Sequence, residues 1–271
     1  MRAGSETYTH GHAESVLRSH MRRTVENSAA YLAGHLRPGV TVLDVGCGPG
    51  TITVDLARRV APGTVLGIEP VPEPLERARA LADELDVRTV RFATGDVYAL
   101  DAADDTFDVV HAHQVLQHLG DPVAALREML RVCRPDGVVA VRDADYQAMT
   151  WYPADPRLDR WLEVYRAVAR GNGAEPDAGR RLVAWARAAG AVDVTPSASV
   201  WCYATTEERT AWGEGWAARI VSSAIARQAV DGGYADAAEL AGIAAAWRDW
   251  AADPDGWFAV LHGEVLCRPA A

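Results

Sequence analysis

The chain has 271 residues, of which 49% are hydrophobic and 24% are charged, and its formal net charge is -10. This composition predicts a globular protein with a substantial core. It disfavours nucleic acid or an anionic membrane as a partner, because both require a basic surface. All of the basic residues are arginines, which excludes chemistry that depends on lysine, such as a Schiff base or a P-loop.

The four cysteines lie far apart in the sequence and include no C-x-x-C pair. Their spacing argues against a zinc ribbon or a disulfide scaffold and is typical of a reducing compartment. The first residues lack the apolar segment of a secretory signal, and no stretch approaches the roughly 20 apolar residues of a membrane helix. We therefore expect a cytoplasmic globular protein.

The predicted elements alternate along the first half of the chain. A rough apolar stripe predicts a helix over residues 15–36. Predicted strands then cover residues 40–45, 64–69, 89–93, 107–113 and 137–142. Predicted helices between them cover residues 51–60, 74–86 and 122–132. Strands that are almost continuously apolar and alternate with helices predict an α/β protein with an open, doubly wound parallel sheet.

The pattern changes after residue 143. Two helices are predicted over residues 156–171 and 177–189, and two long strands over 192–203 and 257–266. About fifty residues between these strands are predicted to be helical. The first helix of this insert opens at Thr205, with Glu208 at capping-box spacing. The sequence therefore predicts a sheet that is completed late and interrupted by a helical cap.

Residues 42–50, VLDVGCGPG, place three glycines at every second position between the first predicted strand and its helix. Such a turn can reverse the chain, or it can bring backbone N–H groups close to a ligand at the carboxyl edge of the sheet. Glu69 ends the next strand, where an acidic side chain can accept hydrogen bonds from ribose hydroxyls. Thr51 stands where the dinucleotide-binding fingerprint has its third glycine, which disfavours that class.

VLDVGCGPG is followed in order by GIEP, TGDV and FDVVHAHQVLQHL. This series resembles the class I S-adenosylmethionine-dependent methyltransferases, and most closely the ubiquinone/menaquinone-biosynthesis-type group that modifies small molecules. The resemblance implies a Rossmann-like, doubly wound sheet of seven strands, the last antiparallel, with helices on both faces. The organisation we expect is an N-terminal lid or helix over 1–36, a cofactor-binding core over 37–203, a helical cap insert over 204–253, and a final core strand within 254–271.

The resemblance also implies a set of cofactor-binding residues. The glycine turn would line the methionine and ribose portions of S-adenosylmethionine, and Asp44 would hold the amino group directly or through water. Glu69 would accept both ribose hydroxyls, and Asp96 with Val97 would face the adenine. The full expected set is Asp44, Gly46, Cys47, Gly48, Gly50, Thr51, Glu69, Pro70, Gly95, Asp96, Val97, His113 and Gln114.

Histidines and aromatic residues are candidates for the reacting end. As catalytic residues we expect His113, His118 and His10, for each of which a structural role stays open. As substrate-binding residues we expect Tyr8, His12, Asp145, Tyr146 and Trp216. The H-x-H-x4-H pattern that begins at His111 lacks an acidic or cysteine partner, so we expect no metal site.

These residues predict methyl transfer by in-line displacement to a small, hydrophobic or aromatic acceptor from secondary metabolism. Two alternatives stay open at this point. One is an NAD(P)-dependent oxidoreductase, and the other is a protein that binds S-adenosylmethionine without catalysis. We expect a small-molecule acceptor, with no nucleic-acid or membrane partner, and a homodimer is compatible with the sequence.

Overall fold

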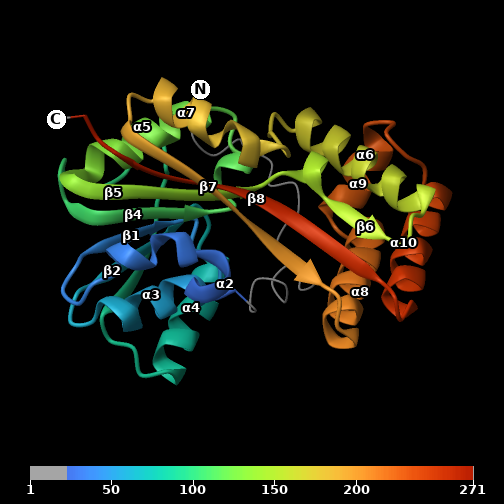
Figure 1. The fold of residues 1–271 in the computed structure, drawn as a ribbon, viewed down its shortest axis with the longest axis horizontal. Helices are drawn as coiled ribbons and strands as arrows, with labels where there is room; N and C mark the ends of the chain where they lie inside the picture. Colours follow the sequence, from blue (N-terminus) through green and yellow to red (C-terminus); the bar gives the residue numbers. More distant parts are fainter. Residues whose placement is uncertain (1–22, 271) are drawn as a thin grey trace.

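The structure is a computed structural model that describes residues 23–270. Its centre is a sheet in the order β3-β2-β1-β4-β5-β8-β6, with β7 paired to β8 (Figure 1). The strands are β1 (Val42–Val45), β2 (Val65–Glu69), β3 (Val90–Thr94), β4 (Phe107–His113), β5 (Cys133–Ala144), β6 (Thr150–Tyr152), β7 (Val192–Tyr203) and β8 (Trp257–Arg268). The pairs from β3 to β5 are parallel, whereas β8 is antiparallel to β5, β6 and β7. The predicted doubly wound sheet with an antiparallel last strand is confirmed, and the short β6 is an additional, eighth strand.

Helices cover both faces of the core sheet (Figure 1). One face carries α2 (Val25–Ser28), α3 (Thr51–Val60) and α4 (Glu73–Glu84), and the opposite face carries α5 (Pro122–Val132) and α7 (Leu182–Ala188). In α3 the apolar side chains of Ile52, Leu56 and Val60 recur at helical spacing and are buried. They pack with Val42 of β1 in one core layer. The central strands β1, β4 and most of β5 are therefore buried on both sides, which accounts for their almost continuously apolar sequences.

The N-terminal helix predicted over residues 15–36 is not continuous in the part that the structure describes. α2 ends at Ser28, and a 3-10 helix, η1 (Ala30–His35), follows it. Thr24 and Asn27 form a capping box that begins α2, and Ala29 leaves the helical conformation at φ -141°. The side chains of Thr24 and Asn27 satisfy backbone N–H groups at the start of α2, which sets the beginning of a separate short helix. Residues 1–22 lie outside the described residues.

A second layer of helices forms the cap. It contains α6 (Pro156–Gly171), α8 (Thr206–Ser222), α9 (Ala224–Asp231) and α10 (Ala237–Ala252). These helices share a core that includes Trp161, Trp216 and Trp247, all of them almost fully buried. Trp161 lies edge-on to Trp216 and Trp247, with ring centroids 4.6 and 4.8 Å apart. The helical unit therefore includes α6 in addition to the helices between β7 and β8.

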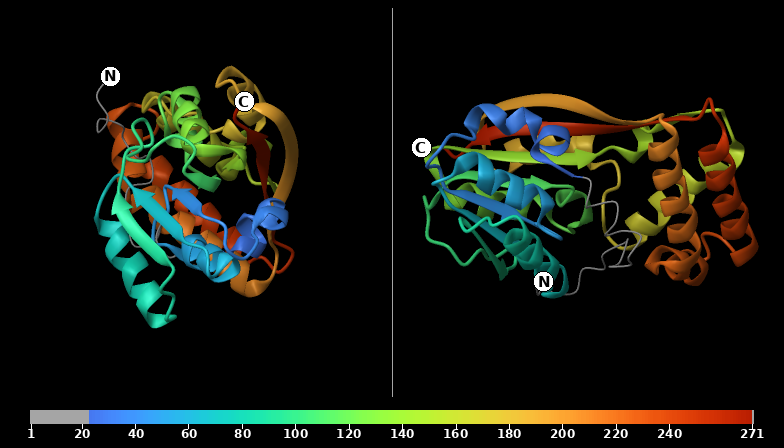
Figure 2. Two further views of the ribbon diagram at one scale, coloured as in Figure 1. Left: turned by 90° about the vertical axis from the view of Figure 1, so that its left-hand side faces the viewer. Right: turned by 90° about the horizontal axis from the view of Figure 1, so that it is seen from below.

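Two long strands connect the core to the cap. Figure 2 shows β7 and β8 running side by side from the core sheet to the cap helices. The second half of β8, from His262 to Cys267, pairs with β5 in the core. Its first residues, Trp257–Ala259, pair with β6 next to the cap. Core and cap are therefore joined by a continuous hydrogen-bonded ribbon.

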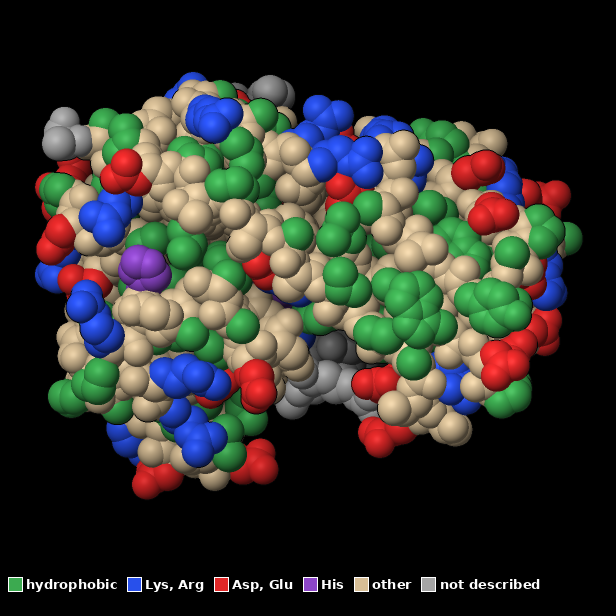
Figure 3. Space-filling view, in the orientation of Figure 1, with side chains coloured by type: hydrophobic (Ala, Val, Ile, Leu, Met, Phe, Trp, Pro, Cys, Tyr) green, Lys and Arg blue, Asp and Glu red, His purple; other side chains and the backbone are tan. Residues whose placement is uncertain are grey.

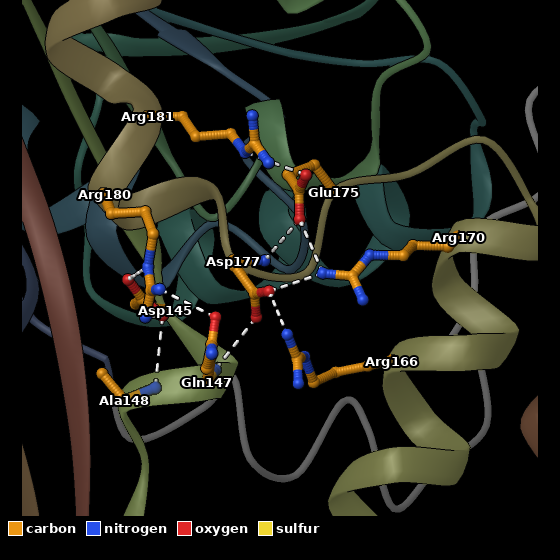
Figure 4. Close-up of polar contacts among 9 residues, drawn as sticks. All are labelled: Asp145, Gln147, Ala148, Arg166, Arg170, Glu175, Asp177, Arg180 and Arg181. Carbon is orange, nitrogen blue, oxygen red and sulfur yellow. Dashed lines mark hydrogen bonds and ion pairs between the residues drawn. The ribbon is translucent and has the colours of Figure 1, made fainter.

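Ion pairs fix the loops at the junction of core and cap (Figure 4). Asp177 is buried and accepts hydrogen bonds from Arg166 and Arg170 of α6 at 2.7 and 2.6 Å. Asp145, just after β5, is paired with both Nε and Nη2 of Arg180, at 2.5 and 2.7 Å. Such bidentate, charge-assisted pairs define geometry as well as adding stability. They attach α6 and the segment before α7 to the end of β5.

The surface carries charges of both signs, interspersed over the face drawn in Figure 3. On the lower edge of that view the molecule is hollowed between the lobe that holds β1–β3 and the lobe of the cap helices. None of the helices within residues 23–270 combines the length and apolar character needed to cross a membrane.

Candidate cofactor and acceptor site

The glycine turn lies at the carboxyl end of β1 and leads directly into α3. Gly46, Gly48 and Gly50 all adopt positive φ, at 67°, 52° and 81°. A Cβ on Gly46 would lie 2.5 Å from the Val115 side chain, and one on Gly50 would lie 2.7 Å from the Cβ of Ala78. Both conformation and space therefore require glycine here. The result is a turn of bare backbone at the edge of the sheet where ligands bind in open α/β folds.

Glu69, at the end of β2, lies directly against this turn. Its carboxylate accepts a hydrogen bond of 3.0 Å from the backbone N–H of Gly48. Within residues 23–270 no other group donates to it, so one carboxylate oxygen retains its acceptor capacity. Burial raises the pKa of Glu69 to about 7, and the nearby charge of Asp44 acts in the same direction. A buried carboxylate with unused acceptor capacity beside bare backbone suits a diol such as the ribose of S-adenosylmethionine.

The segment after β3 is packed beside Glu69. Gly95 donates its N–H to the backbone oxygen of Glu69 at 3.1 Å, and a Cβ on Gly95 would lie 3.2 Å from the Ile68 side chain. Asp96 accepts a hydrogen bond from the N–H of Tyr98 at 2.9 Å, and Val97 is buried. The structure therefore places Gly95, Asp96 and Val97 at the same edge as Glu69. Pro70 follows Glu69 directly.

Asp44 is engaged inside the protein. One of its oxygens accepts from the hydroxyl of Thr53 at 2.6 Å, and the other lies 2.7 Å from Nδ1 of His111. All three side chains are buried. These contacts connect the end of β1 to α3 and β4. They therefore hold the glycine turn, which follows β1, in place.

His113, the last residue of β4, is buried, and neither ring nitrogen has a hydrogen-bond partner among the described residues. Its ring packs against Trp201 of β7 and His262 of β8, with centroids 5.5 and 6.2 Å away. Burial, and then the charges of Arg23 and Arg142, hold the pKa of His113 well below its usual range. The imidazole is therefore neutral at pH 7, with one N–H donor and one acceptor nitrogen.

Gln114 follows in the left-handed region, at φ 55°. Its amide oxygen accepts from Nη2 of Arg23 at 2.7 Å, and its amide nitrogen lies 2.8 Å from Nε2 of His262. This side chain thus joins three segments that are far apart in the sequence. A non-glycine residue at positive φ is uncommon and marks positions where the chain is constrained by its surroundings.

Other candidate residues lie away from this centre or are already paired. His118, in the 3-10 helix η2 (Leu116–His118), lies 3.0 Å from the Gln117 amide nitrogen, and burial lowers its pKa to about 3. Asp145 is held by Arg180. Tyr146 stacks on Tyr165 with centroids 4.0 Å apart.

Trp216 is 1% exposed and packs in the aromatic core of the cap. Tyr8, His10 and His12 lie outside the described residues. Of the aromatic residues, it is Trp201 that the structure brings to His113.

Several polar residues that the sequence analysis did not single out gather beside His113. They are Arg23, Tyr31, Arg142, Trp201, His262 and Glu264. The signal that could have found two of them is a charged residue inside an apolar strand: Arg142 in VVAVRDA and Glu264 in LHGEVL. The two are register partners in β5 and β8, and Nε of Arg142 lies 3.1 Å from Glu264.

Asp143, next to Arg142 in β5, is fully buried. Burial raises the pKa of this carboxyl to about 8, against the opposing effect of hydrogen bonds from the N–H groups of Gln117 and Leu116. Asp143 therefore carries its proton at neutral pH.

Within residues 23–270, no group of three or more histidine, cysteine, aspartate or glutamate side chains is arranged to hold a metal ion.

Comparison with known proteins agrees with this geometry. A profile of the family described as "Methyltransferase domain" matches residues 36–190. An uncharacterized methyltransferase of Schizosaccharomyces pombe is 36% identical over 270 residues, covering 96% of this chain and 95% of the relative. A probable methyltransferase of Aspergillus luteorubrus is 29% identical, covering 97% of each chain.

Among solved structures, the YcgJ protein from Bacillus subtilis superposes with a TM-score of 0.58 at 19% identity, covering 89% of this chain and 98% of that one. At that identity the likeness shows a shared fold. The chain belongs to the class I S-adenosylmethionine-dependent methyltransferases. This membership confirms the resemblance in the glycine turn and disfavours an oxidoreductase.

Proposed function

We propose that the chain transfers a methyl group from S-adenosylmethionine to a small, hydrophobic or aromatic metabolite. The observation that carries the cofactor part of the proposal is the hydrogen bond between Glu69 and Gly48. It places a carboxylate with unused acceptor capacity beside a turn without side chains. A dinucleotide pyrophosphate requires a glycine-rich turn of different spacing, and position 51 is threonine.

The remaining cofactor contacts are assigned by position. In this assignment Gly46–Gly50, with Cys47 and Thr51, line the methionine and ribose portions. Gly95, Asp96 and Val97 face the adenine, and Gln114 lies beside the methionine portion. Asp44 acts mainly by positioning, because both of its oxygens already have partners in Thr53 and His111.

When bound, the cofactor supplies a methyl group on a positively charged sulfur. The chain then has to hold the acceptor atom in line with that methyl group, and positioning of this kind contributes up to about 7–11 kcal/mol to catalysis. His113 is the described side chain best suited to orient an acceptor hydroxyl or amine, because it is neutral and its ring nitrogens have no partner among the described residues. His10 stays a further candidate base.

The aromatic residues near His113 support an apolar acceptor. Trp201 packs on His113, and Tyr203, two residues further along β7, stacks on Trp212 of α8 with centroids 4.2 Å apart. These side chains form a wall from the end of β4 to the cap. Flat aromatic surfaces of this kind bind aromatic and other hydrophobic ligands with little loss of side-chain freedom.

Two measurements test the proposal. Titration calorimetry should show binding of S-adenosylhomocysteine and none of NAD or NADP. Turnover is then followed as S-adenosylhomocysteine formation across a panel of phenols, hydroquinones, amines and carboxylic acids. Failure to bind S-adenosylhomocysteine contradicts the proposal, whereas binding without turnover of any acceptor supports a non-catalytic cofactor-binding protein.

A further inference from the structure

One face of the sheet is polar where β5, β7 and β8 lie together. Arg142 of β5 pairs in register with Glu264 of β8, and Glu264 pairs with Ser197 of β7. Both oxygens of Glu264 are engaged, since Oε2 accepts from Ser197 and Oε1 accepts from Ser199 and Arg142. Charged groups this deep in a protein require partners, because removal from water is costly.

The guanidinium of Arg142 makes only some of the hydrogen bonds that it can donate. The side chain is 0% exposed, and its Nε donates to Glu264 and to Ser199, each at 3.1 Å. The Trp201 ring lies 4.8 Å from its central carbon. Nη1 and Nη2 have no hydrogen-bond partner within residues 23–270. An arginine–carboxylate pair ordinarily uses two parallel N–H groups. In this pair only Nε of Arg142 donates to Glu264, and the terminal nitrogens Nη1 and Nη2 do not contact it.

Two further side chains that can donate a hydrogen bond lie on the same side of the sheet as Arg142. His113 is the register partner of Arg142 on β4, and its ring nitrogens are also buried without a partner among the described residues. The hydroxyl of Tyr31 is also buried without a hydrogen-bond partner among the described residues. Burial raises the pKa of Tyr31, and the charge of Arg142 opposes this increase. Glu264, the acidic group next to Arg142, accepts from Nε alone among the nitrogens of that guanidinium. The arrangement offers N–H and O–H donors and one positive charge, which is what an oxyanion requires.

We propose that Arg142, together with His113, forms a buried binding site for a carboxylate or similar oxyanion. The identity of that oxyanion rests on the proposed function. It belongs either to the methionine portion of the cofactor or to an acidic group of the acceptor, such as a carboxylate or an ionised phenol. In both cases the anion is bound at the end of β4 and β5, beside the Trp201 ring, and it completes the hydrogen bonds of Arg142.

Arg142→Lys tests this site, because it keeps a positive charge beside Glu264 and removes the two terminal nitrogens, Nη1 and Nη2. Arg134→Lys is the matched control, since Arg134 lies on the same strand but pairs with Asp108 at the surface. Thermal unfolding should be measured for both variants, and only folded protein should be titrated. Arg142→Met combined with Glu264→Gln removes the charges in pairs and provides a second test if the single variant does not fold.

Two ligand pairs then distinguish the sources of the anion. S-adenosylhomocysteine and 5′-methylthioadenosine differ in the amino-acid portion. If Arg142 binds the cofactor carboxylate, Arg142→Lys weakens the first at least tenfold and leaves the second unchanged. Benzoate and neutral benzamide probe the acceptor side, with and without S-adenosylhomocysteine. If the anion belongs to the acceptor, wild-type protein prefers benzoate at least tenfold and Arg142→Lys loses the preference.

The proposal is overturned if wild-type protein shows no preference for benzoate and Arg142→Lys binds S-adenosylhomocysteine within twofold of wild type. The same changes in Arg134→Lys would also overturn it, since the effect would then be one of overall charge. Preference for benzoate in a wild-type protein that fails to bind S-adenosylhomocysteine would contradict the proposed function and leave the anion site standing.

Discussion

The carboxylate of Glu69 and the backbone N–H of Gly48 are joined by a 3.0 Å hydrogen bond across the ends of β2 and β1. This bond connects the acidic residue and the glycine turn into one surface. It also leaves the other carboxylate oxygen of Glu69 available to a ligand. The cofactor assignment depends on this pair more than on any single residue of the turn.

Replacement of Glu69 tests the assignment directly. Glu69→Gln keeps the shape of the side chain and removes the charge, so it should weaken S-adenosylhomocysteine binding by about 1–3 kcal/mol, or about 5- to 100-fold. Calorimetric titration measures the change. Glu76→Gln, on the exposed side of α4, provides the control and should bind like wild type. Equal affinity in all three proteins would refute the ribose assignment.

The pKa of Glu69 predicts a pH dependence of binding. With a pKa of about 7 in the unliganded protein, the ionised fraction rises from about 0.1 at pH 6 to about 0.9 at pH 8. Ribose hydroxyls donate to the ionised form, so affinity for S-adenosylhomocysteine should rise about tenfold over this interval. The Glu69→Gln variant should lose this rise, and an equal rise in the variant would assign the titration to another group.

The glycine turn predicts a contrast between two alanine substitutions. Gly39 and Gly46 both have positive φ, at 95° and 67°. A Cβ on Gly39 would meet nothing within 4 Å, whereas one on Gly46 would lie 2.5 Å from Val115. Gly39→Ala should lower the free energy of unfolding by about 1–2 kcal/mol, for the backbone alone. Gly46→Ala should cost about 1–3 kcal/mol more through overpacking. Urea denaturation of both variants measures the difference, and equal losses would show that Val115 moves aside freely.

Asp143 predicts a second pH effect, on stability. Its pKa is raised to about 8 in the folded protein from an ordinary 3.8, so the stability that the neutral carboxyl contributes is fully present below about pH 4 and is lost as the pH rises through about 8. Asp143→Asn stays neutral throughout. Its stability relative to wild type should therefore increase by up to about 1.4 kcal/mol per pH unit between these values, or about 3 kcal/mol from pH 5 to pH 7.

Denaturant unfolding at several pH values tests this expectation, and the difference between the two proteins cancels the titration of the histidines. Asp136→Asn, at an exposed position of the same strand, should keep a constant offset from wild type. A constant offset for Asp143→Asn as well would show that Asp143 is ionised in the folded protein at pH 5.

Much of the fold could be predicted because it is encoded locally. The apolar strands, the glycine turn and the terminal acid Glu69 are each visible within a few residues, and their order indicates the sheet. The partners of Arg142 could not be predicted in this way. Glu264 is 122 positions away, and only the insertion of β8 between β5 and β7 brings it to Arg142.

The same limit applies to Asp44 and to Trp216. The sequence shows that Asp44 lies near the end of the first strand, but not that Thr53 and His111 occupy its two oxygens. Trp216 lies at helical spacing from Trp212, and that spacing is equally consistent with a ligand wall and with a core. Its neighbours Trp161 and Trp247 come from α6 and α10, so its burial depends on the tertiary arrangement of the cap.

The ribbon formed by β7 and β8 has a mechanical consequence. Because the strands pass unbroken from the core to the cap, the cap cannot swing on a loose hinge, and any displacement has to be carried as twist along paired strands. Trp201 and His262 lie on these strands where core and cap meet, and their rings are 4.4 Å apart. Both rings pack against His113, so a twist of this ribbon would reach the end of β4 through them.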